Sequence, residues 1–327
     1  MSLRTRLTDR FDIEHPVLSA PMGFIAGGKL AAAASTAGGL GLIGGGYGDE
    51  EWLRREFAEA GNARVGCGFI TWSLEKKPEL LDLVLERRPA AVMLSFGPVA
   101  EFAPRIKSAG VTLICQVQSL AHAHEAVEAG ADVIVAQGGE AGGHGGDRAT
   151  LTLTPEIADY LGRAEPDTLL VAAGGIADGR GLAAALMLGA DGVLIGSRLM
   201  ASAEALTPRG FLHAILAADG DETVKTTVID VVRNYDWPAP FTGRALRTQF
   251  VREWHGREAM LGEPTTNAAE RERFWDAFNA GQAEHTGVFV GEAVGLIRDT
   301  PSARDVIERM VRDAEQLLSA AGSFVHR

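Results

Sequence analysis

Eight short apolar runs, with helical segments between them, recur along the chain, and their spacing limits the fold more than any other feature. Each run is continuously apolar, as expected for parallel strands covered on both faces. Asp49 and Ser119 are predicted N-caps of two intervening helices, and Thr154 with Pro155 predicts the start of a third. The runs begin near Val17, Leu40, Val65, Ala91, Thr112, Val133, Leu169 and Gly192, at intervals of 23, 25, 26, 21, 21, 36 and 23 residues. Eight β-α units at this spacing predict an α/β fold of the TIM (β/α)8 barrel type.

A doubly wound sheet is the alternative, and it predicts a glycine-rich phosphate turn directly after the first strand. The pattern G-x-G-x-x-G does occur, at residues 39–44. A predicted helix precedes it and the pattern lies inside the second strand, so we do not interpret it as a dinucleotide-binding turn. The barrel is therefore the predicted fold.

The strand periodicity stops after Met200. Helical segments rich in Arg, Glu and Trp follow from about residue 205 to about residue 295. The last segment, residues 302–322, has one apolar stripe, and Ser302 with Asp305 forms a capping box at its start. We predict a barrel made of residues 1–204 and 296–327. Residues 205–295 would be a smaller, mainly helical lid domain inserted before the last helix.

Composition excludes several classes of partner. The 327 residues include 31 basic and 43 acidic ones, for a net charge of −12, which gives no electrostatic reason to bind nucleic acid or an anionic membrane. The N-terminal segment lacks the apolar stretch of a secretory signal, and Cys67 and Cys115 are too few for a disulfide framework. We expect a cytoplasmic protein with two buried free thiols. The oligomeric state stays open, a homo-oligomer included.

Two glycine-containing turns mark a predicted anion site at the active end of the barrel. The seventh strand ends in Gly174-Gly175 and the eighth in Gly196-Ser197. Adjacent glycines let backbone N–H groups point at one anion, and phosphates commonly bind after these two strands of a TIM barrel. The pattern predicts a phosphate-bearing ligand without identifying it.

The widest interval, 36 residues, follows the sixth strand and contains the segment GGEAGGHGGD, residues 138–147. Long loops at this end of a barrel usually bind or catalyse. His144 is the histidine in this loop and is the candidate acid–base group. No metal-spaced cluster, nucleophile elbow or Walker loop occurs, so the sequence predicts no metal site and disfavours acyl transfer.

Residues at the ends of three other strands suit a planar heterocycle. Met22 and Gly23, after the first strand, offer a flat apolar side chain beside a bare backbone, although Met22 as core filler is the simpler alternative. Gly68 and Gln116, at the ends of the third and fifth strands, could hydrogen-bond the edge of a ring.

At these residues the chain resembles the nitronate monooxygenase family, formerly called 2-nitropropane dioxygenases. These are FMN-dependent TIM-barrel enzymes, and they include the flavin-containing enoyl-ACP reductases. The matching pieces are APMG (20–23), AQGGEAGGHG (136–145), AAGGIADG (172–179) and GADGVLIGS (189–197). The resemblance implies FMN as the cofactor and a catalytic role for His144. It also implies FMN contacts at Met22, Gly23, Gly143, Gly174, Gly175, Gly196 and Ser197, with Gln116 and Gly68 where other members contact the flavin. Many members have Asn where this chain has Gly68.

The implied reaction is oxidation of alkyl nitronates, and of nitroalkanes, by O2 to a carbonyl compound and nitrite. Protonated His144 could stabilise the anionic nitronate, and neutral His144 could abstract the α-proton of a nitroalkane. We expect the base action to be secondary, because a nitronate already lacks that proton.

Two alternatives remain. One is an NAD(P)H-dependent FMN reductase of enoyl thioesters or quinones on the same fold, which the lack of a separate dinucleotide motif disfavours. The other is a non-catalytic protein that binds a flavin or phosphate ligand, which the loop histidine disfavours.

Overall fold

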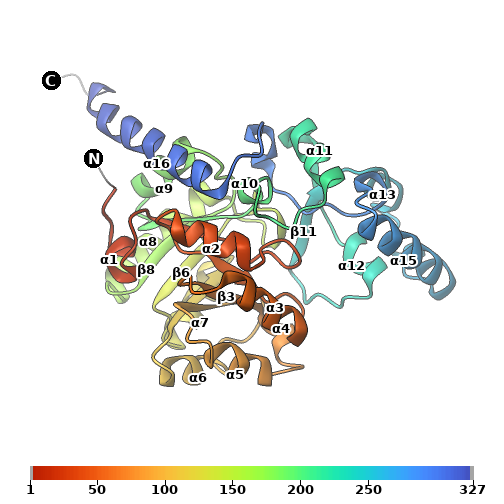
Figure 1. The fold of residues 1–327 in the computed structure, drawn as a ribbon, viewed down its shortest axis with the longest axis horizontal. Coiled ribbons are helices and arrows are strands. Elements are labelled where there is room, and N and C mark those ends of the chain that lie inside the picture. Colours follow the sequence, from red (N-terminus) through yellow and green to blue (C-terminus); the bar gives the residue numbers. More distant parts are fainter. Residues whose placement is uncertain (1–2, 325–327) are drawn as a thin grey trace.

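Eight parallel strands form a closed barrel (Figure 1) in the computed structural model, which describes residues 3–324. In space they follow the order β1-β9-β8-β6-β5-β4-β3-β2, and a bridge between Leu18 and Leu40 joins the two ends of this row. The barrel strands are β1 (Val17–Ser19), β2 (Leu42–Gly44), β3 (Gly66–Ile70), β4 (Ala91–Ser95), β5 (Thr112–Val117), β6 (Val133–Gln137), β8 (Leu169–Ala173) and β9 (Gly192–Ile195). Each predicted apolar run contains one of these strands, so the predicted fold class is confirmed.

Helices cover the outside of the barrel, and the predicted caps at Asp49 and Ser119 are present. The Asp49 carboxylate accepts from the Trp52 N–H at 3.0 Å, and the Ser119 hydroxyl accepts from the His122 N–H at 3.1 Å. The helices of the barrel part are α1 (Arg6–Phe11), α2 (Gly28–Thr36), α3 (Glu50–Ala60), α4 (Thr71–Leu74), α5 (Glu79–Leu85), α6 (Ala103–Ser108), α7 (Leu120–Glu128), α8 (Thr150–Ala164), α9 (Gly179–Met187), α10 (Ser197–Met200) and α16 (Ala303–Ala320).

The prediction that Thr154 and Pro155 begin a helix was wrong. Helix α8 begins at Thr150, and Pro155 lies inside it. The physical reason is a cap supplied from ten residues upstream, because the Glu140 carboxylate accepts from the Thr150 N–H at 3.0 Å. A carboxylate that satisfies a free donor in the first turn stabilises a helix start that the local sequence does not signal.

Two apolar layers hold the barrel together. The interior layer contains inward-pointing side chains of the strands, such as Leu18, Met93 and Val171, together with Leu7 and Phe11 of α1. Leu7 also lies against Gly192, the first residue of β9, so α1 closes the N-terminal end of the barrel. A larger layer fills the space between strands and helices, and α16 packs against α9 and α2 in it. The end opposite α1 is the C-terminal end of the strands.

The segment between α10 and α16 is mainly helical and lies on one side of the barrel (Figure 1). It has an apolar core of its own, which includes Ile229, Phe250, Leu261 and Phe274. The sequence did not predict the pair of antiparallel strands, β10 and β11, in this segment. Its elements are α11 (Arg209–Ala217), β10 (Thr223–Thr226), α12 (Val228–Arg233), β11 (Thr242–Leu246), α13 (Gln249–Trp254), α14 (Glu258–Leu261) and α15 (Pro264–Asn279).

The glycine loop after β6 is joined to this inserted segment. Residues Gly143–Gly145 form a short strand, β7, which pairs antiparallel with β11 and places His144 opposite Gly243. Arg244 donates to the carbonyl oxygen of Gly139 at 2.9 Å, and Lys225 donates to that of Gly146. The loop that carries the histidine is therefore fixed between the barrel and the insertion. None of the helices in residues 3–324 combines the length and apolar character needed to cross a bilayer.

Candidate active site

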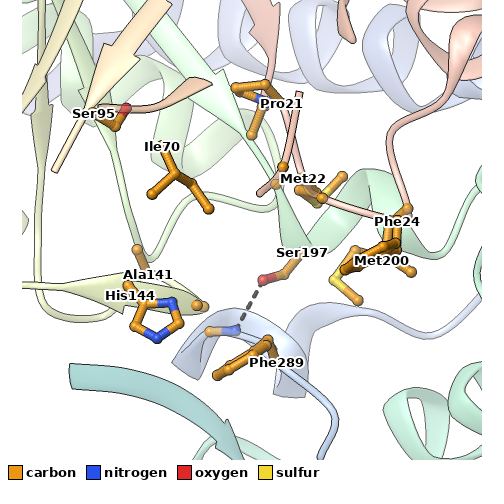
Figure 2. Close-up of a pocket in the computed structure, with 18 of the residues that line it drawn as sticks. Pro21, Met22, Phe24, Ile70, Ser95, Ala141, His144, Ser197, Met200 and Phe289 are labelled. Carbon is orange, nitrogen blue, oxygen red and sulfur yellow. Dashed lines mark hydrogen bonds between the residues drawn. The ribbon is translucent and has the colours of Figure 1, made fainter. Parts of the chain in front are cut away.

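One cavity lies at the C-terminal ends of the barrel strands, against the inserted segment, and Figure 2 shows part of its lining. Every residue to which the sequence analysis assigned a site role lines it. These residues are Met22, Gly23, Gly68, Gln116, Gly143, His144, Gly174, Gly175, Gly196 and Ser197. The fold thus brings together residues from six different strand ends and loops.

The two glycines after β8 form one wall of the cavity with bare backbone. Gly174 has a φ of +102° and Gly175 a φ of +71°, a region that favours glycine. A Cβ atom on Gly174 would lie 2.9 Å from the carbonyl oxygen of Gly138, so a side chain does not fit there. The N–H groups of Gly174 and Gly175 make no backbone hydrogen bond within residues 3–324. Adjacent free donors at this end of the barrel suit an anion.

Ser197 and Glu140 border the same wall, and the side chains of both make hydrogen bonds. The Ser197 hydroxyl accepts from the N–H of Gly291 at 2.9 Å, the contact drawn as a dashed line in Figure 2. The Glu140 carboxylate accepts from both the N–H and the hydroxyl of Thr150 at 3.0 Å. Lysine and arginine are absent from the described lining except for Arg233. Backbone N–H groups would therefore carry most of the binding of an anion at this wall.

The barrel mouth supplies a flat surface and an amide edge. Met22 lies beside Gly196, because a Cβ atom added to Gly196 would be 3.7 Å from the sulfur of Met22. The Gln116 side-chain nitrogen donates to the Gln137 side-chain oxygen at 3.2 Å, and the Gln137 side-chain nitrogen donates to the carbonyl oxygen of His144 at 3.0 Å. Gln137 thus connects Gln116 to the histidine strand, and its role was not predicted.

Gly68 shows why this chain departs from the family pattern at that position. A Cβ atom there would lie 2.3 Å from Cγ of Pro21 and 2.6 Å from its Cβ. The proline ring cannot yield by that much, so this backbone has no space for Asn or any other side chain. Only the backbone of Gly68 is available to a ligand.

His144 is buried and forms a hydrogen-bonded pair with Asp230. Its Nε2 lies 2.8 Å from Oδ2 of Asp230, and the other carboxylate oxygen accepts from Arg233 at 2.9 Å. The Trp237 ring stacks on the imidazole with a centroid distance of 3.4 Å and an interplanar angle of 5°. Burial is the largest influence and lowers the pKa of His144, with Arg233 acting in the same direction and Asp230 opposing both. The imidazole is therefore neutral at neutral pH.

Sequence reasoning missed Asp230, Arg233 and Trp237. Asp230 and Arg233 lie on α12 of the insertion, and 86 residues separate Asp230 from His144. One signal was available: VIDVVR places an acid and an arginine three residues apart in an otherwise apolar helix. Buried charges are rare unless they are paired or functional.

Tyr47 completes the polar cluster behind the histidine. Its hydroxyl accepts from Arg233 at 3.2 Å and from the indole N–H of Trp237 at 3.1 Å, and its ring stacks on Tyr235. Burial raises the pKa of Tyr47 to about 12, so the phenol stays neutral.

On the far side of Ser197 from His144, the cavity wall is apolar and includes Phe24 and Met200 (Figure 2).

Metal ligands and reactive thiols are not part of the site. Within residues 3–324, no three or more His, Cys, Asp or Glu side chains are grouped closely enough to hold a metal ion. Cys67 and Cys115 are free and buried as predicted, and burial raises the pKa of both thiols.

The barrel, the cavity at its C-terminal end and the buried histidine define an enzyme of the TIM-barrel class. The chain belongs to the nitronate monooxygenase family of oxidoreductases, whose model matches residues 4–65 and 70–313. Flavin use is typical of this family.

Individual relatives cover nearly the whole chain. It is 37% identical over 335 residues to a nitronate monooxygenase of Metarhizium robertsii, covering 91% of this chain and 90% of that protein. It is 30% identical over 364 residues to the (3aS,4S,5R,7aS)-5-hydroxy-7a-methyl-1-oxo-octahydro-1H-indene-4-carboxyl-CoA dehydrogenase of Rhodococcus jostii, covering 99% of both. The structure of FabK from Thermotoga maritima is similar with a TM-score of 0.86 and 30% identity, over 99% of this chain and 100% of that one. Because the relatives include a monooxygenase and a dehydrogenase, family membership defines an oxidoreductase but not its reaction.

Proposed function

We propose that this protein binds FMN in the cavity and oxidises alkyl nitronates, and nitroalkanes, with O2 to a carbonyl compound and nitrite. One observation carries the proposal beyond family membership. A buried histidine with a lowered pKa lines the same cavity as a backbone wall with free N–H donors. An acid–base group beside an anion site is what oxidation of a carbon acid next to a phosphate-bearing cofactor requires.

The cavity residues suit FMN. Gly174, Gly175, Gly196 and Ser197 would hold the phosphate through backbone N–H groups, assisted by the serine hydroxyl. Met22 and Gly23 would face the ring, and Gln116 with the backbone of Gly68 would meet its polar edge. Gly143 has a φ of +74° and open space where a Cβ would be, which leaves room beside its backbone. FMN, when bound, supplies the capacity to take electrons from the substrate and to pass them to O2.

The chain's own contribution is proton transfer and exclusion of water. A neutral His144 is suited to accept the α-proton of a nitroalkane, whereas a cation is needed to hold a nitronate. The lowered pKa therefore supports the base role more than the cationic one, contrary to the expectation from the sequence that base action is secondary. The aromatic wall of Trp237, Phe289 and Phe96 around the imidazole reduces access of water to the site.

An NAD(P)H-dependent FMN reductase of an enoyl thioester or a quinone is the second candidate. The observation in its favour is the 30% identity to a carboxyl-CoA dehydrogenase over 99% of both chains. A histidine beside the ring serves either reaction.

Anaerobic mixing of the flavin-loaded protein tests both candidates. Propionate 3-nitronate, NADH and NADPH are added separately while flavin absorbance is followed, and the released flavin is identified as FMN or FAD. Bleaching by the nitronate, with nitrite formed on admission of O2, supports the proposal. Bleaching by NADH or NADPH alone favours the reductase. Failure of all three to bleach the flavin, or release of FAD, refutes the proposal.

A further inference from the structure

We propose that Asp230 and Arg233 of the inserted segment are positioning residues for His144. Asp230 holds the imidazole with its proton on Nε2, which makes Nδ1 the atom that accepts the substrate's proton, and Arg233 pairs with the second carboxylate oxygen and limits how far Asp230 stabilises the protonated ring. This inference rests on the proposed function only for the identity of the substrate.

The contact between Asp230 and His144 selects one tautomer. Their side chains are 4% and 6% exposed, and Nε2 and Oδ2 are 2.8 Å apart. An ionised carboxylate only accepts hydrogen bonds, so a neutral imidazole at this distance carries its proton on Nε2. The lone pair of the neutral ring is then on Nδ1.

Arg233 reduces the tendency of the Asp230 carboxylate to favour a positive charge on the His144 ring. Its guanidinium lies 2.9 Å from Oδ1 of Asp230 and is 7% exposed. Three rings surround it, with centroids 4.7 Å away for Tyr235, 5.4 Å for Phe289 and 5.5 Å for Tyr47. An unpaired carboxylate next to His144 would favour the imidazolium and remove the base. A fixed cation on its other oxygen offsets part of that effect, and burial of the ring outweighs the rest.

Few other groups act on the imidazole. The charged residues that influence His144 within residues 3–324 are Asp230 and Arg233, both on α12. Tyr47, from the loop after β2, is a neutral phenol that contacts Arg233, and the remaining ring neighbours are Trp237, Phe289 and Phe96. The α12 pair therefore sets the tautomer of the base, and together with burial of the ring it sets the charge.

The proton-transfer step balances with these residues alone. The bond between the α-carbon and its hydrogen breaks, the proton moves to Nδ1 of His144, and the electron pair stays on the substrate as the nitronate. His144 then carries a positive charge beside the Asp230 carboxylate.

Asp230→Asn tests the tautomer. The Asn amide can donate to Nε2, which moves the ring proton to Nδ1 and blocks the base. We expect kcat/KM for neutral nitroethane to fall about 10²- to 10⁴-fold, and kcat/KM for ethyl nitronate to fall less than about tenfold. Asp147→Asn is the matched control. It removes a carboxylate that is 88% exposed and contacts Lys225 instead of His144, and it should leave both values unchanged.

Arg233→Met and Arg233→Lys test the charge balance. The Met variant should move the acidic limb of the nitroethane pH profile to higher pH by about one unit or more, because Asp230 then stabilises the imidazolium. The Lys variant retains a cation and should restore most of the wild-type profile. Equal profiles in wild type and the Met variant would overturn the role of Arg233.

Histidine ¹⁵N NMR of the FMN-loaded protein separates this inference from the proposed function. The His144 signal is identified by its absence in His144→Gln. We expect a neutral ring protonated on Nε2 in wild type at pH 7, and on Nδ1 in Asp230→Asn. A doubly protonated or Nδ1-protonated ring in wild type would overturn the inference, as would an unchanged tautomer in the Asn variant. If the expected tautomers are found but nitronates are not oxidised, the proposed function alone fails.

Discussion

Replacement of Gly175 tests where the phosphate of the cofactor is held. Asp and Asn have nearly the same shape and are among the residues that best tolerate a positive φ. The φ of +71° costs each variant about 1–2 kcal/mol of folding free energy. A new Cβ would meet only the side chain of Glu140, with its Cβ at 3.4 Å and its Cγ at 3.8 Å, which are ordinary contacts. Both variants should therefore fold, and the two differ only in charge.

The carboxylate of Gly175→Asp would face the phosphate. Two unit charges about 4 Å apart repel by about 4 kcal/mol at the effective dielectric constant of a protein surface. That energy corresponds to a roughly 10³-fold weaker Kd for FMN. Arg233 is the one lysine or arginine of the described lining, and it pairs with Asp230. Glu140 on this wall is itself acidic, so no nearby cation reduces the repulsion.

The assay is titration of each apoprotein with FMN, followed by quenching of flavin fluorescence. Circular dichroism melting shows that both variants are folded. We expect Gly175→Asn to bind FMN measurably and Gly175→Asp to bind it about 10³-fold more weakly. Binding by the Asp variant within tenfold of the Asn variant would place the phosphate elsewhere and refute the reasoning.

Three further predictions concern His144 and the thiols. His144→Ala should keep FMN bound but lose about 10²- to 10⁴-fold in kcat/KM for neutral nitroalkanes in steady-state assays; wild-type values at full flavin content would remove the residue from the mechanism. Because the folded-state pKa of His144 is lowered, the unfolded chain binds its proton first as pH falls through about 6.5, so the free energy of unfolding should decrease below that pH. Urea titrations at pH 7 and 5 should show a smaller loss for His144→Gln, and an equal loss would contradict this. Cys67 and Cys115 should resist alkylation by iodoacetamide until the protein unfolds, because burial raises their pKa. Alkylation of the native protein, detected by mass spectrometry, would disprove this prediction.

The barrel was predictable because its signals are local. Each strand covered on both faces needs a continuous apolar run, and each run appears in the sequence at the place where the structure has a strand. The glycine pair after β8 was also predictable, since a positive φ at Gly174 and Gly175 requires glycine whatever surrounds it. The buried thiols followed from their apolar neighbours.

The sequence alone therefore determined the barrel, its active end and the histidine loop. Only the tertiary structure decided what that histidine can do. His144 lies in a glycine-rich segment without strand propensity, and β7 forms because β11 supplies its hydrogen-bond partners. Its pKa is lowered first by burial under the insertion. Its partner Asp230, with Arg233, comes from that same insertion and meets His144 only after the insertion packs on the barrel. Hydrogen bonds and burial are set by distances in space. The pattern VIDVVR can signal a buried charge pair, but across 86 residues it does not show that His144 is the partner.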